Sequence, residues 1–98
     1  MKYSRKLTIT KNTNRIEEAD LDVLDVEDAT LTLYHTHVGK LFLHGTCNIH
    51  LRCGSGIDKI SWVHLNDAQA TIILHSEGCE IPWKKMPRGI VVTNCIDE

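Results

Sequence analysis

Residues 19–53 have the sequence ADLDVLDVEDATLTLYHTHVGKLFLHGTCNIHLRC. Along this stretch leucine, isoleucine and valine recur in pairs two positions apart, and each pair brackets a polar or aromatic residue. This alternation is typical of a strand that buries one face and exposes the other. The stretch therefore predicts a series of short strands. The pairs are Leu21 and Val23, Leu31 and Leu33, Leu41 and Leu43, and Ile49 and Leu51.

The same alternation resumes after Gly54-Ser55-Gly56 and continues almost to the last residue. Glycines lie between the pairs, where turns are expected. Helical signals are nearly absent, apart from one possible turn over 14–20. We therefore predict an all-β chain. The later pairs are Ile60 and Trp62, Ile72 and Leu74, and Ile90 and Val92.

The hydrophobic pairs align at a spacing of about twenty residues, which is a property of stacked coils in a β-solenoid. An antiparallel β-sandwich or barrel, the alternative architecture, has a turn every 8–12 residues or so but needs no such alignment. We predict a small β-solenoid of about four coils of about 20 residues, with one slip at Gly54–Gly56 and two interior stacks. The stacks would be Leu21, Leu41, Trp62 and Trp83, spaced 20, 21 and 21 residues apart, and Leu31, Leu51, Ile72 and Val92, spaced 20, 21 and 20 apart.

The open ends of a solenoid present unpaired backbone groups and need covering. We expect residues 1–98 to form a single domain, in which residues 19–83 form the coils. Residues 1–16 would then be an N-terminal arm or cap, and residues 84–98 a C-terminal arm. If these arms do not cap the ends, we expect a homodimer in which the solenoid ends cover each other.

A five-residue repeat within 19–53 resembles the units of pentapeptide-repeat proteins. That family forms a right-handed quadrilateral β-helix with small residues at the inner corners, so the resemblance implies a right-handed solenoid. Some of its members are thought to imitate a nucleic-acid backbone with an acidic surface. Tyr34 and His44 depart from the pattern, because they stand where the family has small side chains. The units are Ala19-Asp20-Leu21-Asp22-Val23, Ala29-Thr30-Leu31-Thr32-Leu33 and Gly39-Lys40-Leu41-Phe42-Leu43.

The composition, 42% hydrophobic and 24% charged, is that of an ordinary soluble globular chain. No apolar run has the length of a membrane span, and no signal-peptide stretch follows the basic residues near Met1. We therefore expect a cytoplasmic protein without a membrane partner, whose four cysteines are reduced. Direct nucleic-acid binding is not expected, because the basic residues are split between the two ends and aromatic residues are few.

Cys47, His50 and Cys53 form the tightest cluster of metal-ligating residue types. Zinc needs three or four such donors converging in a tetrahedron, and this spacing does not complete a set. These residues carry the alternative hypothesis of a metal- or thiol-dependent sensor or enzyme. Our main prediction has no cofactor, no metal and no catalytic residue, since a short solenoid offers no deep pocket and no phosphate-binding loop is present.

Charged and apolar residues at outward positions predict a protein-binding surface. The sequence favours a non-enzymatic module that binds another protein, such as a small inhibitor or adaptor. A solenoid that assembles end to end is the structural alternative. The predicted contact residues are an acidic edge of Asp20, Asp22, Asp25 and Glu27 and an apolar strip of Phe42, Val63 and Ile73.

Overall fold

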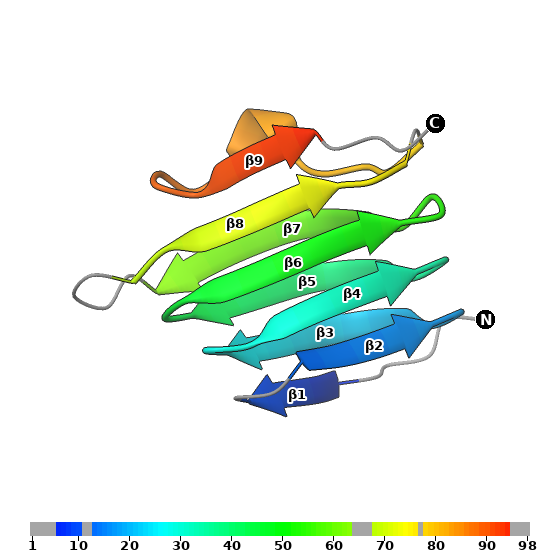
Figure 1. The fold of residues 1–98 in the computed structure, drawn as a ribbon, viewed down its shortest axis with the longest axis horizontal. Helices are drawn as coiled ribbons and strands as arrows, with labels where there is room; N and C mark the ends of the chain where they lie inside the picture. Colours follow the sequence, from blue (N-terminus) through cyan, green and yellow to red (C-terminus); the bar gives the residue numbers. More distant parts are fainter. Residues whose placement is uncertain (1–5, 11–12, 64–67, 77, 95–98) are drawn as a thin grey trace.

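The protein forms two parallel β-sheets in a computed structural model that describes residues 6–10, 13–63, 68–76 and 78–94 (Figure 1). Sheet A has the strand order β1-β3-β5-β7, and sheet B has the order β2-β4-β6-β8-β9. The strands of sheet A are β1 (Lys6–Thr10), β3 (Asp20–Glu27), β5 (His37–His44) and β7 (Gly56–Val63). Those of sheet B are β2 (Thr13–Glu17), β4 (Thr30–Tyr34), β6 (Cys47–Arg52), β8 (Ala70–Leu74) and β9 (Val91–Asn94), and a short 3-10 helix, η1, spans Trp83–Lys85.

From β1 to β8 the chain alternates between the two sheets as it climbs, so that one strand from each sheet makes one coil; β9 then joins sheet B after η1. Every pairing between the described strands is parallel, as stacked coils require and antiparallel sandwiches or barrels do not allow. In Figure 1 the nearer strands run from left to right and the farther ones from right to left as the chain rises, which is a right-handed winding. The predicted solenoid of about four coils is confirmed, and the sandwich or barrel alternative is wrong.

The predicted stacking of side chains from coil to coil is mostly wrong. Leu41 pairs with Leu24 and Ile60, not with Leu21 and Trp62, and only the pairing of Ile72 with Val92 is as expected. The first coils are shorter than twenty residues, and the longer loop between β7 and β8 lengthens a later one. A register shifted by two residues, as from Trp62 to Ile60, places an equally apolar side chain inside, so the alternation could not distinguish between such registers. The shift from Leu21 to Leu24 is three residues, and it is possible because the inward positions of β3 change from odd to even numbers after Leu21.

Each of the three long strands of sheet A contains a bend at which two successive residues face outward. In β3 the buried residues Leu21 and Leu24 enclose Asp22, which is exposed, and Val23, which is partly exposed. The same spacing of buried residues recurs in β5 (Val38 and Leu41) and in β7 (Ile57 and Ile60). The bend shifts the outward positions of β3 from even to odd numbers. This shift keeps all four predicted acidic residues outside the core.

At one corner of the coils the backbone turns through residues with positive φ, namely Glu18, His35 and Cys53. Two buried hydroxyls satisfy the backbone groups there. The Thr36 N–H donates to Ser55 Oγ at 3.1 Å, and Ser55 Oγ lies 3.0 Å from the carbonyl oxygen of Leu33. Thr36 Oγ1 also lies 3.3 Å from the carbonyl oxygen of Ile16 in the preceding coil, so these hydrogen bonds tie three successive coils together.

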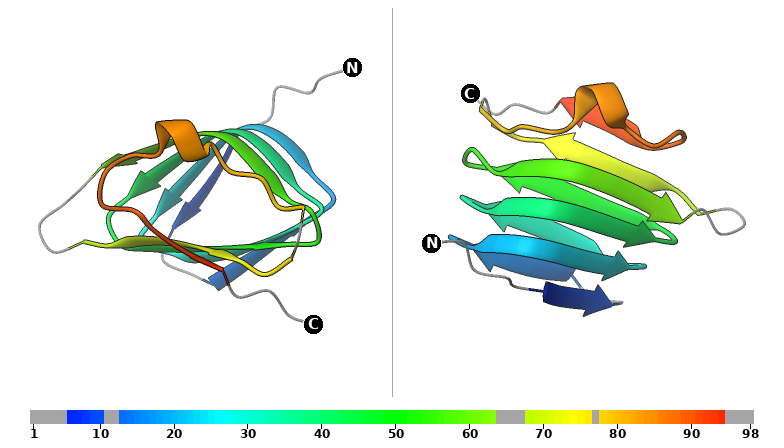
Figure 2. Two further views of the ribbon diagram at one scale, coloured as in Figure 1. Left: turned by 90° about the horizontal axis from the view of Figure 1, so that it is seen from above. Right: turned by 180° about the vertical axis from the view of Figure 1, so that it is seen from behind.

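The two ends of the stack differ from the predicted arms. Strands β1 and β2 pair with β3 and β4, so part of residues 1–16 forms a coil and not an arm. At the other end, Ile81 is buried, and Met86 and Ile90 pack against the core, so this segment covers the last coil (Figure 2). Trp83, predicted to be in the interior, is 59% exposed. Within the described ranges no helix is long and apolar enough to cross a membrane.

Candidate functional site

The four predicted acidic residues share the outer face of sheet A. Asp20, Asp22 and Glu27 are exposed, and Asp25 is half-buried. The neighbouring inward residues Leu21, Leu24 and Val26 belong to the core cluster, which holds β3 in place. The acidic edge is therefore a row of carboxylates on a rigid strand.

Histidines of β5 lie against two of these carboxylates. His37 Nδ1 is 3.3 Å from Asp20 Oδ1, and its Nε2 is 3.0 Å from Asp58 Oδ1 on β7. The hydrogen bond to Asp58 is the main reason why the pKa of His37 is raised; Asp20 adds to it, and partial burial opposes it. His44 Nε2 lies 3.5 Å from Asp25 Oδ1. The histidines thus partly neutralise this edge when they are protonated.

The carboxylates of Asp22 and Glu27 are available for contacts with another molecule. Within the part of the chain that the structure describes, neither side chain forms an ion pair or a hydrogen bond. In the strand register Asp22 stands beside Gly39, where an added Cβ would lie 2.9 Å from the Asp22 carbonyl oxygen. A glycine at this position therefore lets β5 approach β3 closely.

The predicted apolar strip is divided between the two sheets. Phe42 is half-exposed on sheet A, where it pairs with Asp25 on β3 and Ser61 on β7. Ile73 is on sheet B, between His50 and Thr93. Val63 pairs with His44 at the end of β7, but its side chain lies outside the described part of the structure. Only Phe42 is shown to accompany the acidic edge.

A basic group at the C-terminal end lies beyond β7 on the same side as sheet A. Lys84 and Lys85 are exposed on η1, next to the exposed ring of Trp83, and Arg88 is exposed shortly after. Seen from behind in Figure 2, η1 stands above β7 and in front of β9. The sequence shows these cations, but it did not place them on the face that carries the acidic edge.

The metal-ligand candidates are not brought together. Cys47 is fully buried, and its thiol lies 3.6 Å from the carbonyl oxygen of Val26; burial raises its pKa. His50 faces outward from the same strand, and Cys53 is exposed at the corner. Among the described residues no group of three or more histidine, cysteine or acidic side chains is arranged to hold a metal ion.

His50 instead pairs with His75, a contact that the sequence did not suggest. His50 Nδ1 lies 2.7 Å from His75 Nε2, and the two rings stack with centroids 5.0 Å apart. Burial, followed by the nearby His75 and Arg52, lowers the pKa of His50. Because one imidazole must donate and the other accept, this contact cannot form while both facing nitrogens carry a hydrogen.

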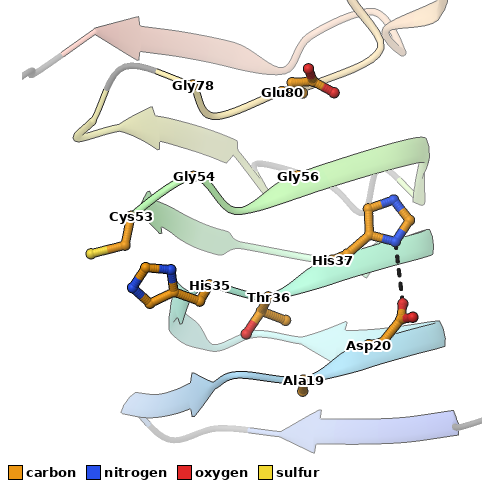
Figure 3. Close-up of a pocket in the computed structure, with 10 residues that line it drawn as sticks. All are labelled: Ala19, Asp20, His35, Thr36, His37, Cys53, Gly54, Gly56, Gly78 and Glu80. Carbon is orange, nitrogen blue, oxygen red and sulfur yellow. Dashed lines mark hydrogen bonds and ion pairs between the residues drawn. The ribbon is translucent and has the colours of Figure 1, made fainter.

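An open groove of about 570 Å³ runs along the corner that carries His35 and Cys53. In Figure 3 the His37 ring points toward Asp20, whereas the Cys53 sulfur points away from the groove. Glu80 lies on the C-terminal side of the groove, and the glycines at 54, 56 and 78 line it without side chains. The groove combines carboxylates and imidazoles, but no hydrogen bond joins the Cys53 thiol to a histidine in the described residues. This geometry does not assemble an activated nucleophile.

Comparisons with protein-family models, with curated proteins and with solved structures found no match. The resemblance to pentapeptide-repeat proteins therefore stays a prediction.

Proposed function

We propose that the protein is a non-enzymatic module that binds another protein through the outer face of sheet A. The observation that carries the proposal is that Asp22 and Glu27 are exposed on a strand held by the core and form no ion pair or hydrogen bond with their side chains among the described residues. The partner surface would be basic, because fixed carboxylates attract cations and speed the encounter. An inhibitor or an adaptor would act in this way without performing chemistry.

Phe42 supports this proposal because it supplies an apolar contact in the middle of the charged face. It is half-exposed and pairs with Asp25, so an aromatic ring and carboxylates are presented together. Interfaces concentrate their binding energy in a few residues, commonly aromatic ones, surrounded by polar contacts. Ile73, on the other sheet, would not take part in the same contact.

A cytoplasmic location is part of the proposal. Cys47, Cys53 and Cys79 are free thiols, which suits a reducing compartment. The alternative of a metal- or thiol-dependent sensor gains no support from the geometry, because Cys47 and His50 face opposite sides of β6.

The test uses two variants with the same change in net charge. Asp22→Asn/Glu27→Gln neutralises the exposed carboxylates of β3, and Thr30→Lys/Thr32→Lys adds two charges on the outward side of β4 in the same coil. Tagged proteins would be incubated with lysate of the source cells, and the captured proteins would be identified by mass spectrometry. We expect the first variant to lose a basic partner that the wild type and the second variant retain. Equal capture by all three proteins would contradict the proposal, provided that their far-ultraviolet circular dichroism agrees.

A further inference from the structure

Among the described side chains on the outer side of sheet A, the charge changes from acidic on β3 to basic on η1 beyond β7; β1, on the other side of β3, adds only Thr8 to the described side chains. Strand β3 contributes four carboxylates, and η1 at the other end contributes two exposed lysines. The strands between them carry a formal charge close to zero, since β5 adds Lys40 and β7 adds both Asp58 and Lys59. The order β3, β5, β7, η1 is visible from behind in Figure 2.

Such a face is complementary to a second copy of itself turned upside down. A two-fold axis parallel to the strands, between β5 and β7, would place η1 of each copy against β3 of the other. The β5 strand of each copy would then face β7 of the other, so that Lys40 of one copy would stand level with Lys59 of its partner and next to Asp58. A two-fold interface uses the same patch on both subunits and makes each favourable contact twice.

We infer that the protein forms a two-fold symmetric dimer through sheet A, in which Lys84 and Lys85 of one protomer contact the β3 carboxylates of its partner. The inference rests on the proposed function, because it names a second copy of this chain as a basic partner of the acidic edge. Trp83 would be covered in this dimer, which accounts for a 59% exposed tryptophan beside the two lysines.

The size of the face sets the strength of the dimer. Strands of eight residues at about 3.3 Å per residue, over four levels about 4.8 Å apart, give roughly 500 Å² per protomer. Stable complexes bury about 800 Å² per partner, so this contact belongs to the weak class. Its ion pairs lie at an exposed interface and are screened by salt. The dimer is therefore weak and salt-sensitive.

Sedimentation velocity of the full chain tests the inference. The wild type dimerises in about 0.05 M salt, and its dissociation constant rises at least about tenfold at about 0.5 M salt. Lys84→Glu/Lys85→Glu makes both ends of the face acidic. Asp22→Lys/Glu27→Lys brings the formal net charge of β3 to zero and puts lysines at the two exposed carboxylate positions without a charged partner among the described residues. Each variant alone is a monomer, whereas an equimolar mixture forms a heterodimer. Thr93→Glu/Asn94→Glu, which alters exposed residues of β9 on sheet B, dimerises like the wild type.

A wild type that stays monomeric at millimolar concentration would overturn the inference, and so would a dimer that survives Lys84→Glu/Lys85→Glu. Binding of monomeric wild type to anionic lipid vesicles or to a single-stranded oligonucleotide, lost in that variant, would assign the basic group to an anionic partner and would also overturn it. If Asp22→Lys/Glu27→Lys does not fold, Lys84→Glu/Lys85→Glu and the salt dependence of the wild type still decide whether the dimer forms through these charges. A monomeric wild type whose partner capture depends on Asp22 and Glu27 would refute the dimer and leave the proposed function standing.

Discussion

Replacing Ser55 with alanine removes a single oxygen atom from the centre of the corner between sheets B and A. Ser55 is fully buried, and its Oγ accepts a hydrogen bond from the Thr36 N–H at 3.1 Å. The same hydroxyl can donate to the carbonyl oxygen of Leu33 at 3.0 Å or of Arg52 at 2.8 Å. The substitution therefore leaves one buried donor unpaired and removes one donor to a carbonyl group.

The expected cost follows from these two losses. A buried polar group left without a partner costs about 1–3 kcal/mol, and a hydrogen bond lost from a folded protein about 1 kcal/mol. We expect Ser55→Ala to lower the free energy of unfolding by about 2–4 kcal/mol, out of the 5–15 kcal/mol or so that is usual for a domain. With a urea dependence of about 1.5 kcal/mol per molar, the unfolding midpoint would fall by about 1–3 M.

Urea unfolding followed by circular dichroism measures this difference. Ser61→Ala is the matched control, because Ser61 is exposed on β7 and its change should cost less than about 0.5 kcal/mol. If the two variants unfold within about 0.5 kcal/mol of each other, the assigned role of the Ser55 hydroxyl is wrong.

Two further predictions concern the core and the pH dependence of stability. Leu41→Ala, at a fully buried position, should cost about 3–5 kcal/mol in the same urea assay, whereas Phe42→Ala, at the adjacent outward position, should cost about 1 kcal/mol; equal costs would contradict the assigned faces of β5. The pKa of His37 is raised from 6.5, so its contacts with Asp58 and Asp20 stabilise the fold fully below that value and lose their effect as the pH rises through the higher folded pKa. The stability advantage of the wild type over His37→Asn should therefore be larger at about pH 5.5 than at about pH 8.5, and by no more than about 1 kcal/mol because the side chain is 46% exposed; a larger advantage at the higher pH would contradict the ion pairs.

Much of the fold could be predicted because the alternation in residues 19–53 is a local property. A strand turns successive side chains to opposite faces, so the pattern alone places Leu31 and Leu33 inside and Asp20 and Asp22 outside. Asp25 and Glu27 also face outward, but strict alternation would turn them inward, and it is the bend in β3 that keeps them outside. The metal-ligand cluster was misleading because Cys47 and His50 stand an odd number of positions apart on one strand and must face opposite ways.

The sequence by itself determined most of the side chains that face inward, with Val23 and Trp83 as exceptions, and the tertiary structure decided which of them are neighbours. Alternation repeats every two residues, so it cannot select among registers that differ by two, and Leu41 pairs with Ile60, not with Trp62. The neighbour of Leu41 on the other side is Leu24, not Leu21; this shift of three residues is possible because of the bend in β3. Only the stacked coils bury Ser55 within a glycine-rich turn and bring His50 to His75. Only the covering of the last coil leaves Trp83 and its lysines on the face of the acidic edge, because that position depends on packing between distant segments and not on any local pattern.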